Sequence, residues 1–215
     1  MRISLLFFSL LSTLVIAQNS DSLTVKNKYE PNFMVGIDVL NLGVGAFSDR
    51  MLVQGFVSSR IKKDLHATLD LGYDDNIYQK NGYDVKANGI FGKVGGFYML
   101  LKDAENSFNG FYAGPKIGAS FYTQEYMKVP VRGNEGGDAS LSFGPSSQSS
   151  YWLEASIGGR VQLFDSNFYI DVNVQPKYLL HSTLQEGIKP MIVPGFGRSS
   201  ANFNFGFAWN IAYKF

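Results

Sequence analysis

Residues 203–215 read FNFGFAWNIAYKF, and this stretch decides the fold class. Every second position from Phe203 to Phe215 carries a large apolar side chain, whereas the positions between them carry Asn, Gly, Ala or Lys. Successive side chains of a β-strand point to opposite faces, so a period of two indicates a strand with one apolar face. The C-terminal stretch therefore predicts a strand that is apolar on one side only.

The same alternation recurs in seven segments upstream. They cover residues 33–42, 51–61, 65–73, 84–101, 111–122, 152–163 and 168–180. Several exceed the ~9–11 residues with which a tilted strand crosses a bilayer. After residue 17, no stretch approaches the ~18 continuous apolar residues of a spanning helix. The sequence therefore predicts an all-β protein with eight strands.

The connections between these segments alternate in length. Short polar connections fall at 62–64, 102–108 and 165–167, and mostly longer ones at 43–50, 76–83, 124–150 and 183–200. If the short connections share one rim, both ends of the strand region lie on that rim too. An even strand number, short periplasmic turns and longer outer loops are typical of outer-membrane barrels. We therefore predict an eight-stranded antiparallel up-and-down transmembrane β-barrel.

The polar faces of the predicted strands favour a membrane barrel over a soluble one. They are rich in Gly, Ser, Asn, Gln and Tyr, and only 17% of all residues are charged, against roughly 25% in a typical soluble domain. In a soluble sheet these faces would meet water. Small polar residues instead suit the interior of a narrow barrel. A soluble secreted barrel is the alternative.

The N-terminal residues have the pattern of a secretory signal peptide. Arg2 supplies a positive charge, residues 3–16 are mostly apolar, and Ala17 fits the small-residue rule for cleavage. A membrane anchor is the alternative, but it needs ~20 apolar residues. The sequence therefore predicts a signal peptide over 1–17, a periplasmic N-terminal segment over 18–31 and the barrel over 32–215.

Charge and cysteine content limit the partners. The formal net charge is +1, so we expect no nucleic-acid partner, since such binding works through excess positive charge. The chain contains no cysteine, which excludes disulfides and lipid attached through cysteine. Membrane lipid is the partner that the apolar strand faces predict.

Charged residues of both signs fall on the inward faces of the predicted strands. They are Asp38, Arg60, Lys93, Lys116, Glu154, Arg160, Asp171 and Lys177. One interpretation is a narrow path for ions or protons. The favoured interpretation is a polar core that neutralises itself, because an unpaired buried charge is costly. Glu154 and Arg160 lie too far apart along one strand to pair, so each needs a partner on a neighbouring strand.

The sequence offers little for catalysis. His66 and His181 are the only histidines, and no G-x-S-x-G motif occurs. An eight-stranded barrel has an interior just wide enough for its own side chains. We therefore expect no catalytic residues, no metal site and no cofactor, and we do not expect an enzyme.

Two of the longer connections are candidates for binding. Residues 124–150 form the longest connection, and long loops on a rigid scaffold commonly carry function. Residues 183–200 include Ile192, Val193 and Phe196, which are unusually apolar for an exposed segment. These three side chains either fold over the barrel mouth or contact a partner.

The last strand also carries a family resemblance. Its Trp209, Tyr213 and Phe215 resemble the C-terminal assembly signal of outer-membrane β-barrel proteins. The resemblance implies the outer membrane of a Gram-negative bacterium and recognition of this strand by the outer-membrane protein assembly machinery. The segments FYAGPK at 111–116, WLE at 152–154 and IVPGFG at 192–197 resemble small, porin-like barrels of Bacteroidota-type bacteria.

The resemblance indicates location and architecture more than activity. We expect a non-enzymatic barrel that serves as a structural or binding component of the outer membrane, or as a subunit of a larger assembly with another outer-membrane protein. A narrow channel and a lipid-active barrel enzyme are the alternatives.

Overall fold

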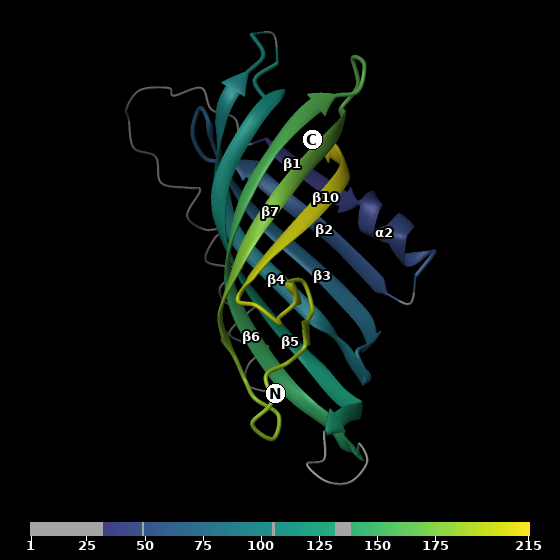
Figure 1. Ribbon diagram of the computed structural model, residues 1–215. Helices are drawn as coiled ribbons and strands as arrows, with labels where there is room; N and C mark the ends of the chain where they lie inside the picture. Colours follow the sequence, from purple (N-terminus) through teal and green to yellow (C-terminus); the bar gives the residue numbers. More distant parts are fainter. Residues whose placement is uncertain (1–31, 49, 105, 132–138) are drawn as a thin grey trace, which may run out of the picture. The chain divides into compact units, whose positions relative to one another are not determined.

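The computed structural model describes residues 32–48, 50–104, 106–131 and 139–215. The predicted signal peptide over 1–17 and the whole predicted periplasmic segment over 18–31 lie outside these ranges. Eight strands close into a barrel in the order β1-β10-β7-β6-β5-β4-β3-β2 (Figure 1). They are β1 (Phe33–Asp38), β2 (Met51–Arg60), β3 (Leu65–Lys80), β4 (Tyr83–Lys102), β5 (Gly110–Val131), β6 (Ala139–Gln162), β7 (Phe168–Ser182) and β10 (Phe203–Lys214).

Every neighbouring pair in this ring is antiparallel, and β1 closes the barrel against β10. The predicted eight-stranded antiparallel up-and-down barrel is therefore confirmed. Of the described residues, no helix is both long enough and apolar enough to cross a membrane.

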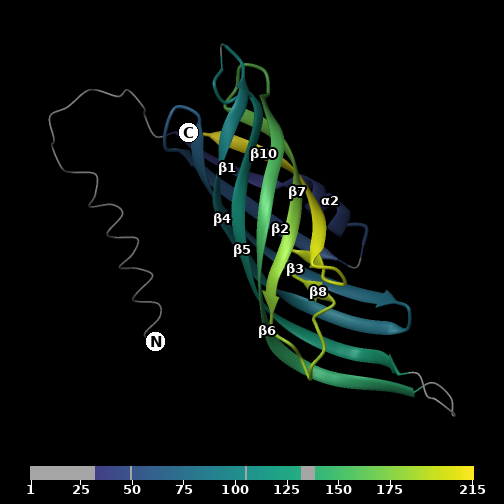
Figure 2. The same ribbon diagram turned by 60° about the vertical axis from the view of Figure 1, so that its left-hand side comes forward.

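The barrel has two rims, as Figure 2 shows from the side. The terminal rim carries Phe33, Phe215 and the β2–β3, β4–β5 and β6–β7 turns, as the short connections predict. The loop rim carries the remaining connections. One of them includes a two-stranded sheet of β8 (Ile192–Val193) and β9 (Gly197–Arg198).

Strand register shows that the wall is strongly tilted. Val35 pairs with Val57, and the row of direct partners continues through Leu69, Val94, Ile117, Leu153, Tyr178 and Phe203. On the other side, Val35 pairs with Tyr213, ten residues after Phe203 on β10. Such a stagger accompanies the strand tilt that closes a barrel.

The expected strand over 33–42 is wrong after Asp38, where the chain turns into the helix α2 (Val39–Gly45). The Asp38 carboxylate accepts hydrogen bonds from the backbone N–H groups of Leu40 and Asn41, at 3.1 and 3.2 Å. A carboxylate at this position satisfies free N–H groups of the first helical turn. Asp38 therefore ends β1 and begins α2.

Two expected connections are largely strand. Residues 76–83 belong almost wholly to β3 and β4, which join at Asn81 and Gly82 with φ of 55° and 80°. Positive φ at both positions is the requirement of a tight two-residue hairpin turn. In the expected loop 124–150, β5 continues to Val131 and β6 begins at Ala139. Polar, apolar and turn-forming residues are mixed in these segments, and the β5–β6 pairing is irregular near Tyr126, so the period of two is broken there.

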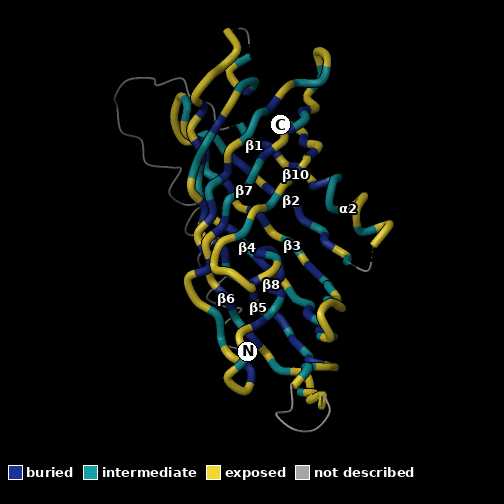
Figure 3. Tube along the Cα trace, viewed as in Figure 1, coloured by how far each residue is buried: buried dark blue, intermediate teal, exposed yellow. Residues whose placement is uncertain are grey.

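Burial alternates along the strands, as the dark blue and yellow residues of Figure 3 show. The buried positions carry mostly polar and aromatic side chains, and the exposed positions carry large apolar ones. The barrel is thus polar inside and apolar outside, as predicted from the strand faces.

Candidate functional site: a charged interior beside a gap in the barrel wall

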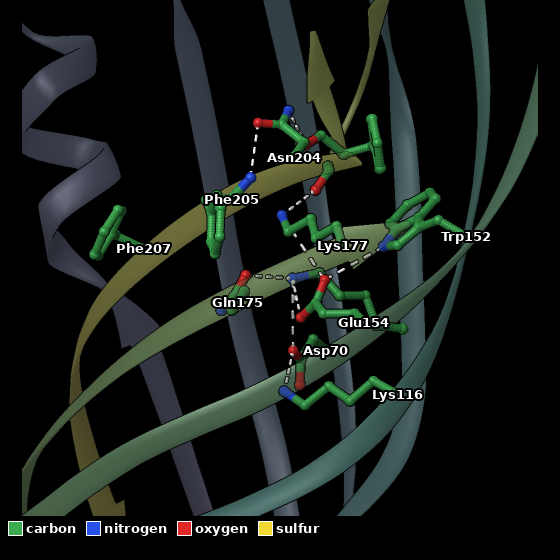
Figure 4. Close-up of polar contacts among 12 residues, drawn as sticks. Asp70, Lys116, Trp152, Glu154, Gln175, Lys177, Asn204, Phe205 and Phe207 are labelled. Atoms are coloured by element: carbon green, nitrogen blue, oxygen red, sulfur yellow. Dashed lines mark hydrogen bonds and ion pairs between the residues drawn. The ribbon is translucent and has the colours of Figure 1, made fainter. Parts of the chain in front are cut away.

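Three lysines and two carboxylates form a cluster in the barrel interior, which we call the charge cluster. Asp70 pairs with Lys93 in the β3–β4 register, and Glu154 pairs with both Lys116 on β5 and Lys177 on β7. One inward-facing residue from each of the five strands β3 to β7 therefore lies at nearly the same height in the barrel. Figure 4 shows Lys177 between Glu154 and Asn204.

Lys93 lies at the centre of the charge cluster. Its Nζ donates to Glu154 Oε1 at 3.2 Å and to Gln175 Oε1 at 3.1 Å, and lies 3.9 Å from Asp70 Oδ2. Lys116 Nζ donates to Asp70 Oδ2 at 2.6 Å. Each carboxylate therefore faces at least two cations, which offsets part of the cost of burying it.

The charge cluster is not neutral. Lys177 Nζ lies 3.8 Å from Glu154 Oε2, but its hydrogen bond goes to the carbonyl oxygen of Gly195 at 2.7 Å. Three lysines share two carboxylates, so with every group charged the cluster has one formal positive charge in excess. Lys177 makes no ion pair shorter than 3.8 Å, and it is therefore the lysine of the cluster that a carboxylate neutralises least.

Arg160 and Asp171 form a separate ion pair nearer the terminal rim. They are partners in the β6–β7 register, and Arg160 Nε donates to Asp171 Oδ2 at 2.8 Å. The Asp171 carboxylate also accepts from Tyr112 Oη at 2.8 Å and from Asn210 Nδ2 at 3.2 Å. The cross-strand partner of Arg160 is thus Asp171. The partners of Glu154 are Lys93 and Lys177.

The other two predicted interior charges lie at the edges of the interior. Asp38 is fully buried and caps α2. Arg60 is partly exposed at the terminal rim, where its guanidinium lies 5.0 Å from the ring centre of Phe108. These two residues do not join the charge cluster.

The segment 191–198, which we call the plug, folds into the barrel mouth at the loop rim. Its Ile192, Val193 and Phe196 are 1%, 0% and 2% exposed and pack in one apolar cluster with Phe91 and Trp152. Of the two interpretations of these side chains, this placement corresponds to folding over the barrel mouth, because all three are buried there.

The wall of the barrel is interrupted between β2 and β10, which we call the wall gap. Because β1 ends at Asp38, its register with β10 begins only at Asn210 and its register with β2 ends at Gly55. Beyond these points α2 stands beside both strands. Trp209 N–H donates to Asp38 Oδ1 at 3.4 Å, and Asn41 Nδ2 donates to the Phe207 carbonyl oxygen at 3.2 Å.

Side chains therefore replace part of the missing strand at the wall gap. A cavity of about 400 Å³ opens there, lined by Arg50, Lys177 and Arg198 among others. Arg50 holds Asp74 through two hydrogen bonds of 3.0 and 2.8 Å. The gap thus connects the outer face of the wall with the cationic end of the interior.

Sequence reasoning left several members of this site out of the candidate residues. The period of two puts Asp70 and Gln175 on the polar faces of their strands, but it does not connect them with the lysines. Arg50 and Asp74 lie where the alternation fades, and only the fold brings them together.

Two residues of the predicted assembly signal, Trp209 and Tyr213, lie on the outer face of β10, and Phe215 follows its end. Trp209, Tyr213 and Phe215 are exposed, and the Tyr213 ring packs edge-on against those of Phe168 and Phe215 at 5.1 and 4.9 Å. They form part of the apolar exterior and do not contact the charge cluster.

Among solved structures, the chain is similar to the N-terminal β-barrel domain of OprF from Pseudomonas aeruginosa. The sequence identity is 10% and the TM-score 0.38, over 86% of this chain and 100% of that one. It is also similar to Neisserial surface protein A (NspA), with 14% identity and a TM-score of 0.34, over 86% of this chain and 94% of that one. No curated protein matches the sequence significantly. The model of the family described as "Domain of unknown function (DUF6048)" matches residues 1–215, and the chain therefore belongs to that family.

Proposed function

We propose that this protein is a non-enzymatic β-barrel of the outer membrane of a Gram-negative bacterium, with a structural or binding role. The apolar exterior of the barrel carries the proposal. The row of direct partners from Val35 through Phe203 forms a band of exposed apolar side chains that touches all eight strands. An apolar surface of this extent marks contact with a membrane or a partner, and a band around the whole barrel fits lipid.

The interior supports a structural or binding role over conduction. The plug occupies the mouth at the loop rim, and Phe108 from the β4–β5 turn is buried at the terminal rim with Met34, Phe56 and Tyr169. Between these ends, the cavity bordered by Asp70 and Arg160 measures only about 20 Å³, close to the space of one water molecule. We therefore expect no conductance above background in planar bilayers.

The predicted partners remain part of the proposal. The exposed outer face of β10, with Trp209 and Phe215, supports recognition by the outer-membrane protein assembly machinery. The apolar exterior also supports a lateral contact with another outer-membrane protein.

Labelling of single cysteines on intact cells tests both location and orientation. The chain contains no cysteine, so Leu184→Cys on the loop rim and Asp165→Cys in the β6–β7 turn each create one exposed thiol. A maleimide that cannot cross membranes should label Leu184→Cys on intact cells and Asp165→Cys only after lysis. The reverse result overturns the orientation, and a chain found in the soluble fraction overturns the membrane location.

A further inference from the structure

The wall gap opens a cationic cavity toward the outer face of the barrel. The described lining residues of the cavity include Arg50, Lys177 and Arg198 and no carboxylate. Three buried carboxylates contact lining residues: Asp74 accepts from Arg50, Glu154 lies 3.8 Å from Lys177, and Asp38 accepts from Asn41. None of the three lines the cavity and none pairs with Arg198, so positive charge exceeds negative charge at the surface of the cavity. Such a surface favours an anionic group.

Of the three cations that line the cavity, Arg198 is the one without a carboxylate partner among the described residues. Its guanidinium lies 5.3 Å from the ring centre of Tyr78, and within the described residues no carboxylate oxygen lies within 4.0 Å of it. The guanidinium group can hold a phosphate oxygen through paired N–H groups. Arg198 is thus free to bind an anion at the mouth of the cavity.

Gly206 on β10 keeps the cavity open. A Cβ atom at this position would lie 2.8 Å from Lys177 Nζ and 3.1 Å from Gln175 Oε1. Any side chain here would enter the space in front of Lys177. The absence of a side chain at residue 206 therefore gives a ligand access to the lysine.

An apolar groove continues from the cavity along the outside of the wall. It has a volume of about 630 Å³ and lies between α2 and the outer faces of β7 and β10, with Val39, Phe47, Ile170 and Trp209 among its lining residues. Leu40 and Val44 line both the groove and the cavity, so the two spaces adjoin. Both volumes fall in the range of roughly 300–1,000 Å³ that is typical of ligand sites.

We propose that the wall gap binds one lipid of the surrounding membrane through an anionic phosphate of its headgroup. The phosphate group lies in the cavity against Arg198 and Lys177, and an acyl chain lies in the groove under α2. The assignment rests on the membrane location proposed above. Charge complementarity favours the anionic headgroup, and the adjoining apolar groove favours a lipid over a small soluble anion.

The position of the wall gap explains how such a lipid would enter. Trp209 and Ile211 belong both to the groove and to the apolar exterior of β10. A lipid at the barrel surface therefore reaches the groove laterally, without leaving the bilayer. Beyond the end of β1, α2 and its Asn41 contact to Phe207 border the path.

Tryptophan quenching by brominated lipids tests the proposal. Trp209 lines the groove, whereas Trp152, the only other tryptophan, is fully buried in the barrel. The full chain is placed in phosphatidylcholine nanodiscs that contain a minor fraction of lipid with brominated acyl chains. This lipid is either phosphatidylglycerol or, in the matched sample, phosphatidylcholine. We expect saturable quenching that is stronger with the anionic lipid.

Two variants test the proposed contacts. Arg198→Gln removes one charged hydrogen-bonding group and should weaken the apparent affinity for phosphatidylglycerol about tenfold. Gly206→Val fills the space before Lys177 and should lower the quenching to that of phosphatidylcholine. Lys189→Gln is the matched control, because Lys189 is an exposed cation of the loop rim outside the cavity, and its variant should behave as the parent protein.

The outcomes separate this proposal from the membrane location. A chain that does not insert, as judged by the absence of a heat-modifiable folded band, overturns the membrane location itself. An inserted chain that is quenched equally by both lipids overturns the lipid site. Quenching by phosphatidylglycerol that is unchanged in both Arg198→Gln and Gly206→Val also overturns it.

Discussion

The β5–β6 side of the barrel and the β1 side are built in opposite ways. β5 has 22 residues and β6 has 24, and their register runs from Gly110 to Val131 with only two irregularities. β1 has six residues and then gives way to α2. On the first side backbone hydrogen bonds close the wall, and on the second side Asp38 and Asn41 side chains replace them.

The comparison shows that the barrel can close although its strands differ greatly in length. A strand edge without a partner leaves unpaired N–H and C=O groups, which are especially unfavourable in lipid. The short side tolerates this edge because polar side chains and a capped helix cover part of it. The long side supplies the rigid frame on which the charge cluster is fixed.

The largest expected effect comes from the charge cluster on the long side. Glu154→Gln leaves Lys93 and Lys177 without their shared carboxylate. Removal of one partner from a buried ion pair costs about 3–5 kcal/mol. We expect that loss in the free energy of unfolding, measured with urea on protein folded in lipid vesicles.

A matched carboxylate outside the cluster serves as the control. Asp75 lies 3.9 Å from Lys86, and both side chains are partly exposed. Asp75→Asn should cost no more than about 1 kcal/mol, as exposed pairs do. An equal loss in the two variants would contradict the stabilising role of the charge cluster.

The plug gives the second effect, on the side of the wall gap. Phe196 is buried against Trp152, with ring centres 6.1 Å apart. Phe196→Ala should cost about 3 kcal/mol in unfolding free energy, the lower end for removing a buried aromatic ring, because the loop rim can partly close around the space. Phe164→Ala is the control, because this ring of the β6–β7 turn is almost fully exposed, and it should change stability little. A loss there as large as that of Phe196→Ala would contradict a stabilising role of the buried Phe196 ring.

Replacement of Asp38 tests whether its side-chain hydrogen bonds stabilise the edge where β1 ends. Asp38→Ala removes the acceptor for Leu40 N–H and Trp209 N–H and should cost about 1–2 kcal/mol. Hydrogen exchange should accelerate at the amides of Leu40, Asn41 and Trp209. Asp38→Asn keeps an acceptor and should lose less, whereas unchanged exchange in Asp38→Ala would show that Asp38 does not hold this edge.

The smallest effect concerns Asp64 in the β2–β3 turn of the terminal rim. A hydrogen bond from Lys102 lowers the pKa of the partly exposed Asp64 carboxyl below its ordinary value. The charged form is thus favoured in the folded protein, so the stabilisation exists above the ordinary carboxyl pKa and is lost as the pH falls through the lowered pKa. NMR titration should show this low pKa, and Lys102→Met should raise it. Unchanged titration in Lys102→Met would exclude the contact.

The period of two predicted most of the wall because outward-facing apolar positions and interior positions alternate in the middle of each strand. It failed where the environment stops alternating. Residues 76–83 and the ends of β5 and β6 mix polar and apolar side chains without a regular alternation, and only pairing reveals them as strands. α2 was missed because Val39 and Leu40 fit an apolar strand as well as a helix and residues 43–45 were assigned to a connection. The decisive signal was the capping role of Asp38.

The candidate site was predictable only in part. The alternation of inward and outward positions placed Lys93, Lys116, Glu154 and Lys177 inside the barrel. Which of them pair with one another depends on the strand register, and the sequence alone does not determine it. The wall gap follows from the early end of β1 and from Gly206, and neither has a pattern of its own in the sequence.

The short β1 also bears on the order of folding. Met34 and Lys214 are partners although they are 180 residues apart, whereas every other neighbouring pair in the ring joins segments that follow one another among the barrel strands. Contacts between residues far apart in the sequence form late, because closing the long loop between them lowers the chain entropy before the contacts can stabilise the fold. We therefore expect the seam between the first and last strands to form last and to reopen first, so that thermal fluctuations of the barrel concentrate beside the wall gap.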